Sequence, residues 1–209
     1  AIELLGQLYR QQHRFSDLAD QLELRLLRNF ADDEVPCHQE LAHLYAERLN
    51  DQAGALRHRL VLHERAPADL DITQMLAQTY ERLEDWARAF SLWDSVIVQA
   101  ESEASRSPEE LAKLRSRVGR MRWRRGLKAE AVVDLEKAVE HDSHQREALE
   151  LLREYYSESK DWEKLVRFVA AEIAATAQAR DKTALMLQLA DICKAHLNRP
   201  EDEIRWLLQ

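Results

Sequence analysis

The fold is decided by the stretch LAQTYERLEDWARAFSLW, residues 76–93. Leu76 and Tyr80 stand four residues apart, which places both side chains on one face of a helix. Asp85 follows where a carboxylate can cap the start of a second helix, and Trp86 opens that helix with a large apolar side chain. The stretch therefore predicts two helices joined by a short turn.

The same helical spacing continues through almost all 209 residues, and no window alternates as a half-buried strand would. The chain has only four glycines and four prolines, too few for the turns of a β-sandwich or a glycine-rich nucleotide fold. Ser107 followed by Pro108 and Glu110 has the pattern of a capping box. The sequence predicts an all-α protein of about twelve helices.

The helices repeat. Six positions are equivalent in the pattern, and successive gaps between them are 36, 35, 42, 34 and 37 residues: Tyr9, Tyr45, Tyr80, Arg122, Tyr156 and Cys193. The expected units are residues 1–33, 34–67, 68–106, 107–143, 144–180 and 181–209. We expect these units to form a single repeat domain, 1–209.

Small residues recur at fixed places in the third and fourth units, at Ala77, Ala89, Gly119 and Ala131, and Gly126 follows at a turn. In these positions the chain resembles the tetratricopeptide repeat (TPR) family, whose unit is a pair of antiparallel helices. Helices that cross closely leave room only for small side chains. The resemblance implies a right-handed α-solenoid.

Other units depart from the family pattern. Leu18 and Arg25 stand in the first unit where small residues are usual, and Leu165 and Glu172 do so in the fifth. Cys193 takes the aromatic position of the sixth unit.

The gap of 42 residues is seven longer than the usual spacing of about 35, which corresponds to about two helical turns. We expect the second helix of the third unit to continue through Gln99–Glu103 and a corner to protrude near Ala104–Ser107. This corner is either a surface extension or a contact with a partner.

The sequence contains no motif of an enzyme or nucleotide-binding site, so no catalytic residue and no cofactor are predicted. His141 and His144 lie in an expected loop without a complete set of metal ligands nearby, and no metal site is predicted.

Charge is the conspicuous feature. The formal net charge is −8, yet residues 113–128 contain eight basic residues and no acidic one. Lys113, Arg117, Arg120 and Arg124 are spaced four, three and four residues apart and form a row along one helix. The TPR resemblance, with Gly119 as the small residue, implies that this row faces the concave groove.

Gln78 and Glu81 of the third unit are placed in the same groove. The direction in which Trp123 points depends on the register of the repeat. If Arg122 holds the aromatic position, Trp123 faces the groove as an anchor for a partner, and a register shifted by one residue would bury it.

Two explanations of the basic row remain open. Four glutamates spaced three, four and four residues apart could pair with it as an internal ladder: Glu147, Glu150, Glu154 and Glu158. Alternatively, part of the row binds an acidic peptide or a terminal carboxylate. Nucleic acid is disfavoured because acidic groove residues such as Glu81 repel phosphate.

The predicted function is a non-catalytic scaffold that binds a protein or peptide in its concave groove. A spacer section of a longer solenoid, with internally paired charges, is the alternative, and an RNA-binding helical repeat is a weaker one.

The chain shows no membrane-spanning run and no signal peptide, and Cys37 and Cys193 form no disulfide framework, so a cytoplasmic protein is expected. Its opening in helical pattern without methionine suggests a fragment of a longer protein. The apolar end Trp206-Leu207-Leu208 suggests end-to-end self-association.

Overall fold

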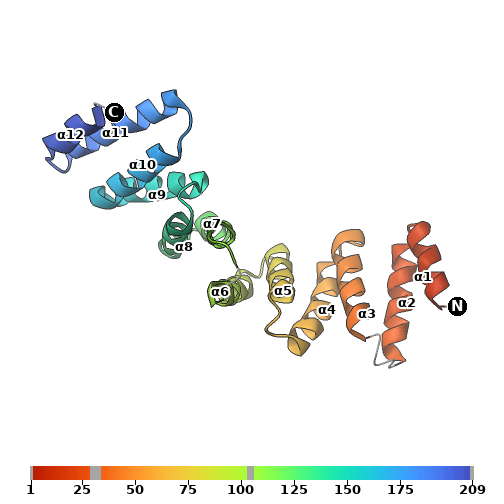
Figure 1. The fold of residues 1–209 in the computed structure, drawn as a ribbon. Helices are drawn as coiled ribbons and strands as arrows, with labels where there is room; N and C mark the ends of the chain where they lie inside the picture. The colour runs from red at the N-terminus through yellow and green to blue at the C-terminus, as the bar shows by residue number, and fades with distance from the viewer. Residues whose placement is uncertain (1, 29–33, 103–105, 208–209) are drawn as a thin grey trace. The chain divides into compact units, whose positions relative to one another are not determined.

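The computed structural model describes residues 2–28, 34–102 and 106–207, and these contain helices and turns but no strand (Figure 1). The all-α prediction is confirmed. The helices are α1 (Ile2–Gln11), α2 (Phe15–Leu27), α3 (Glu34–His43), the π-helical segment η2 (Leu44–Arg48), α4 (Gln52–Arg65), α5 (Leu70–Arg82), α6 (Trp86–Ser102), α7 (Pro108–Arg124), α8 (Lys128–His141), α9 (Arg146–Ser159), α10 (Trp162–Ala175), α11 (Ala179–Ala195) and α12 (Pro200–Leu207).

The chain divides into two compact units, Ala1–Ala100 and Glu101–Gln209. In the first, α1 packs on α2, α2 on α3, α3 on α4 and α4 on α5. In the second compact unit, each helix from α7 to α11 packs on the next helix in the chain, and α7 also contacts α9. Within each unit, therefore, helices pack chiefly on their neighbours in the chain, as a helical repeat requires.

One turn recurs in all six helix pairs. A backbone N–H five or six residues further on donates to the carbonyl of each of the six equivalent positions, at 2.8–3.1 Å: Tyr9, Tyr45, Tyr80, Arg122, Tyr156 and Cys193. The six positions that are equivalent in the sequence therefore make the same hydrogen bond, which ends the first helix of each pair.

The residue before each donor has positive φ, between 51° and 79°: His13, Asn50, Glu84, Gly126, Lys160 and Asn198. A left-handed residue at a helix C-terminus reverses the chain so that the second helix returns along the first. The tight turn predicted at Gly126 is confirmed, and residues other than glycine adopt the same conformation at the five other turns.

Local capping fixes where helices begin. Ser107 and Glu110 form the predicted capping box at the start of α7. Asp51, Asp69 and Asp161 accept hydrogen bonds from backbone N–H groups at the starts of α4, α5 and α10.

Small residues are buried where the helices of a pair cross. Ala77, Ala89 and Ala131 are fully buried. A methyl group added at Gly119 would lie 2.8 Å from Leu135 Cγ, so α7 and α8 approach as closely as a glycine allows. The predicted role of these positions is confirmed.

Aromatic residues fill the core as expected at several positions. Tyr80 and Tyr156 are buried, and Trp93 is completely buried. Tyr9 and Tyr45 are partly buried and pack against the core of the first unit.

The longer helix predicted in the third unit is α6, whose 17 residues exceed the 13 or 14 of α2, α4, α8 and α10. It extends to Ser102. Glu103 and half of the expected corner, Ala104 and Ser105, lie outside the described residues, and so does Leu208 at the apolar end.

Candidate functional site

The predicted basic row lies on α7 in the second unit. Lys113 and Arg124, at its two ends, are exposed and form no ion pair within the described part of the chain. Arg117 and Arg120 are partly buried. Arg120 forms an ion pair with Glu147 of α9. The row therefore keeps exposed cations at both ends and is held to α9 at Arg120.

Two other cations of the basic segment point inward. Arg115 and Arg122 lie one heptad apart, and both donate to the buried carboxylate of Asp134 on α8. The Nε of Arg115 also donates to Glu101 at 2.7 Å. Arg115 is 5% exposed and Asp134 is 3% exposed. These residues hold α7 and α8 together and are not available to a partner.

The acidic row on α9 is only in part the ladder expected from the sequence. Glu147 pairs with Arg120 of α7, whereas Glu158 and Glu154 face Lys128 of α8 at 2.7 Å and 4.0 Å. Glu150 pairs with Arg146 on its own helix. Glu147 thus ties the acidic row to the basic row at Arg120.

Trp123 lies at the junction of α7 and α9. The carbonyl of Arg122 accepts the turn hydrogen bond, so Arg122 does hold the position that tyrosines occupy in other helix pairs. The Trp123 indole is partly buried, with its ring centroid 6.3 Å from that of Tyr155, edge to face. Lys128 Nζ lies 4.8 Å from the indole centroid. Trp123 therefore combines a packed edge with a partly accessible surface beside the cations.

Gln78 and Glu81 belong to α5, in the compact unit Ala1–Ala100. Gln78 is partly buried, and the carboxylate of Glu81 accepts a hydrogen bond from Trp93 Nε1. Glu81 thus satisfies the indole N–H of a completely buried tryptophan. This contact gives Glu81 a role inside its own helix pair.

A hollow of about 430 Å³ lies between α9 and α11 in the second unit and is lined by Glu150, Leu151, Arg153, Glu154, Ser157 and Gln188. Arg153 faces Glu172 of α10 at 3.7 Å. Burial raises the pKa of Glu172, and Arg153 opposes this effect.

The His141–His144 segment forms a local turn. Asp142 Oδ1 accepts a hydrogen bond from the backbone N–H of His144 at 2.9 Å, and this hydrogen bond lowers the pKa of the Asp142 carboxyl. Across the described ranges, no three His, Cys, Asp or Glu side chains are placed to hold a metal ion. None of the described helices combines the length and apolar character needed to cross a bilayer.

The structure resembles known helical-repeat proteins. A chain from the Naa15/Naa10 structure bound to HypK-THB matches 91% of this chain with a TM-score of 0.58 and 18% identity, although the match covers 29% of that chain. MamA residues 41 to the end, from Desulfovibrio magneticus RS-1, matches 84% with a TM-score of 0.51 and 14% identity, over 92% of its own length.

PilF of Pseudomonas aeruginosa matches the whole chain, over 88% of its own length, with a TM-score of 0.50 and 13% identity. No family model and no curated protein sequence matches. Together with the six recurring turns, these likenesses define a TPR-like helical repeat.

Proposed function

We propose that the chain is a non-catalytic scaffold that binds a segment of another protein, with the basic row of α7 as part of the contact surface. This proposal rests mainly on Lys113 and Arg124, which are exposed and form no ion pair in the described part of the chain. The chain as a whole is acidic. Similar charges three or four residues apart on a helix repel one another. A bound anionic group relieves that repulsion.

The proposed partner segment is acidic. Guanidinium groups bind carboxylates through paired hydrogen bonds, and Trp123 adds an apolar surface beside them. Aromatic and arginine side chains are the residues that most often dominate the free energy of protein interfaces.

A known structure with a similar fold supports a scaffold role in general terms. The Naa15/Naa10 structure is bound to HypK-THB, which is a property of that complex. The likeness extends to this chain as a fold, and the acidic segment is argued from the charges of α7 alone.

The test is an array of 15-residue peptides graded in net charge, probed with the parent chain and with the double variant Lys113→Glu/Arg124→Glu. Acidic peptides are expected to bind the parent and to lose about ten-fold or more in affinity with the variant, because two charge-assisted contacts become repulsive. The matched control is Lys137→Glu/Arg180→Glu, which makes the same change in net charge at exposed positions of α8 and α11.

Equal binding by parent and variant, with unchanged helicity, would remove α7 from the contact surface. Steeply salt-dependent binding of an oligouridine, in place of peptides, would instead indicate a nucleic-acid partner.

The second candidate is a structural spacer in which charges serve only to hold helices together, and the Arg120–Glu147 pair favours it. This function predicts that Glu147→Gln/Glu154→Gln lowers thermal stability clearly while no peptide of the array binds. Peptide binding with little loss of stability would reject the spacer.

A further inference from the structure

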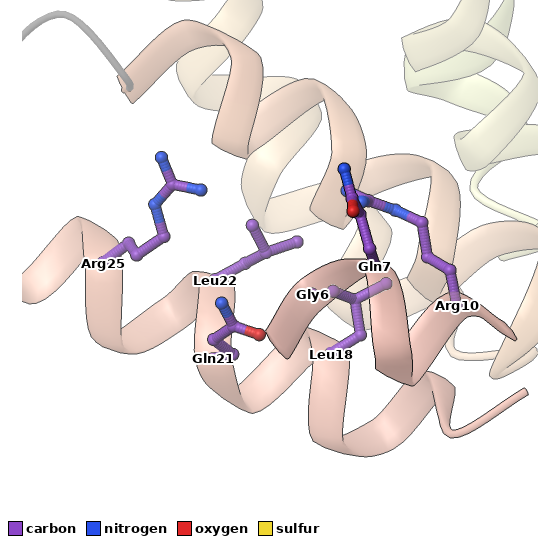
Figure 2. Close-up of a pocket in the computed structure, with 7 residues that line it drawn as sticks. All are labelled: Gly6, Gln7, Arg10, Leu18, Gln21, Leu22 and Arg25. Atoms are coloured by element: carbon purple, nitrogen blue, oxygen red, sulfur yellow. The ribbon is translucent and has the colours of Figure 1, made fainter. Parts of the chain in front are cut away.

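A cavity of about 270 Å³ lies between α1 and α2 in the first unit, away from the α7 row in sequence. Its lining residues are shown in Figure 2: Gly6, Gln7 and Arg10 from α1, with Leu18, Gln21, Leu22 and Arg25 from α2. No acidic residue lines it. The cavity therefore combines two cationic side chains, two amides and an apolar floor.

Beside the cavity, this helix pair is less tightly packed than the fourth pair is at the equivalent glycine. Gly6 stands three residues before the turn carbonyl of Tyr9, as Gly119 does before that of Arg122. A methyl group added at Gly6 would meet its nearest neighbours at 3.6 Å, against 2.8 Å at Gly119. The first pair thus leaves space where the fourth pair is in contact.

Arg25 occupies a position that is apolar in the third and fourth helix pairs. It stands sixteen residues after the turn carbonyl of Tyr9 (9 to 25), where the third and fourth pairs have Val96 and Ala138 (80 to 96, 122 to 138). Val96 and Ala138 are completely buried, whereas Arg25 is partly exposed and lines the cavity. A long cationic side chain therefore replaces a packing contact at the cavity wall.

Arg10 shows what the guanidinium groups of this cavity bind. Its Nε and Nη2 donate to one oxygen of Glu40 on α3, and its side chain remains 48% exposed. A guanidinium has five donor hydrogens, so Nη1 can serve a second carboxylate. In Figure 2, Arg10 and Arg25 lie toward opposite ends of the lining side chains, with Leu22 and Gln21 between them.

We propose that this cavity binds acidic side chains of a protein segment, with Arg10 and Arg25 each receiving a carboxylate above the buried side chains of Leu18 and Leu22. The two buried leucines, 1% and 2% exposed, form a fixed apolar floor. Gln7 and Gln21 supply amide groups for the segment's backbone. The site is separate from the α7 row and requires no contribution from it.

The test is a titration of the blocked peptide Ac-Glu-Ala-Glu-NH2 followed by NMR, with the amide of Gly6 as reporter and Ac-Gln-Ala-Gln-NH2 as the uncharged probe. The acidic peptide is expected to bind weakly and to shift the Gly6 signal, while the glutamine peptide does not. Arg10→Gln and Arg25→Gln are each expected to weaken binding about ten-fold, the effect of losing one charge-assisted contact.

Arg28→Gln is the matched control, because it removes the same charge from the C-cap of α2, and Arg28 does not line the cavity. Arg25→Lys keeps the charge and is expected to retain most of the binding, which separates recognition from a loosened helix pair. Lys113→Glu/Arg124→Glu leaves this titration unchanged, so failure of the α7 proposal is read independently. Equal binding of the two peptides, or unchanged affinity in both glutamine variants, would overturn the assignment.

Discussion

Gly119 lies at the closest approach of α7 and α8. The methyl group of an alanine there would be 2.8 Å from Leu135 Cγ and 3.2 Å from the backbone oxygen of Ala131. Only backbone or side-chain displacement can relieve contacts of this length, because the interior is already close-packed.

Gly119→Ala is therefore expected to destabilise the protein by about 1–3 kcal/mol, which exceeds the gain of up to about 1 kcal/mol from the better helix propensity of alanine. Urea unfolding measures the change. Gly6→Ala is the matched comparison, since its methyl group fits at 3.6 Å and only the propensity gain remains. A Gly119→Ala protein as stable as the parent would show that α7 and α8 can move apart freely.

Glu84 adopts the left-handed conformation, with φ of 59°, in the turn between α5 and α6. Side chains other than glycine are strained there by about 1–2 kcal/mol. Glu84→Gly is expected to raise stability by about 0.5 kcal/mol once the greater chain entropy of glycine is subtracted. Gly126→Ala places a side chain at φ of 79° and is expected to act in the opposite direction. Thermal unfolding of both variants tests this; the same sign for both would contradict it.

Six turn positions could be predicted at this scale because each turn is coded locally, by the helix that ends and the helix that begins. Arg122 was aligned with tyrosines from spacing alone, and its carbonyl makes the same hydrogen bond. Whether the Trp123 side chain is buried or exposed could not be predicted, because its packing depends on Tyr155 of another helix pair.

The pairing of α7 with α8 rests on a buried charge network. Asp134 Oδ1 accepts from Arg115 at 2.9 Å, and its other oxygen accepts from Arg122. Removing one partner of such a network leaves buried cations uncompensated, which costs about 3–5 kcal/mol.

Asp134→Asn is thus expected to lower the free energy of unfolding by about 3–5 kcal/mol, measured by urea denaturation. Glu158→Gln, which breaks an exposed pair with Lys128, is the control and is expected to leave the midpoint unchanged. A small effect of Asp134→Asn would mean that Glu101 alone balances Arg115.

The interface of α2, α3 and α4 contains a pair of histidines whose rings share a hydrogen bond. His38 Nδ1 and His58 Nδ1 are 2.9 Å apart, and His58 Nε2 lies 3.1 Å from the carboxylate of Glu23. If both rings are neutral and His58 donates to Glu23, its Nδ1 must accept from His38. The pair can hold one added proton, but two would set N–H against N–H.

Burial lowers the pKa of His58 and of His38, against the opposing influence of Glu23 on both and of Glu34 on His38. The histidine rings of the unfolded chain titrate at about pH 6.5, so the unfolded chain binds more protons than the folded chain below that pH. Stability is therefore retained above about pH 6.5 and falls as the pH decreases toward the folded values.

The midpoint temperature of the parent is expected to fall more between about pH 7.5 and 5 than that of His38→Gln, in which the ring pair is absent. His43→Gln removes an exposed histidine from the same helix and serves as the control. Parallel pH profiles for the parent and His38→Gln would contradict this account. Sequence spacing could not reveal the pair, because it joins residues twenty positions apart on different helices.

Over the whole chain, hairpins contact mainly their neighbours within each compact unit, so stability is expected to be local. Asp134→Asn should increase amide hydrogen exchange in α7 to α9 and leave α1 to α4 unchanged. Mass spectrometry of exchanged peptides resolves the two regions. A uniform loss of protection would show a single cooperative unit instead.

The fold was predictable at this scale because six similar hairpins repeat one local pattern, and helical spacing identifies each. The candidate site was predictable only as a row of cations on one helix. Which cations of residues 113–128 are paired depends on neighbouring helices: Arg115, outside the row, turns inward to Asp134, and Arg120 meets Glu147, while Lys113 stays exposed.

The position occupied by Arg25 has a counterpart in the fifth hairpin, where Glu172 stands sixteen residues after Tyr156 and also lines a cavity. The two hairpins carry opposite charges at a place where Ala138 makes an ordinary packing contact. A single amino-acid exchange there changes the charge that one hairpin presents at its cavity while the backbone of the array is kept. Repeats of this kind can diversify their partners one unit at a time.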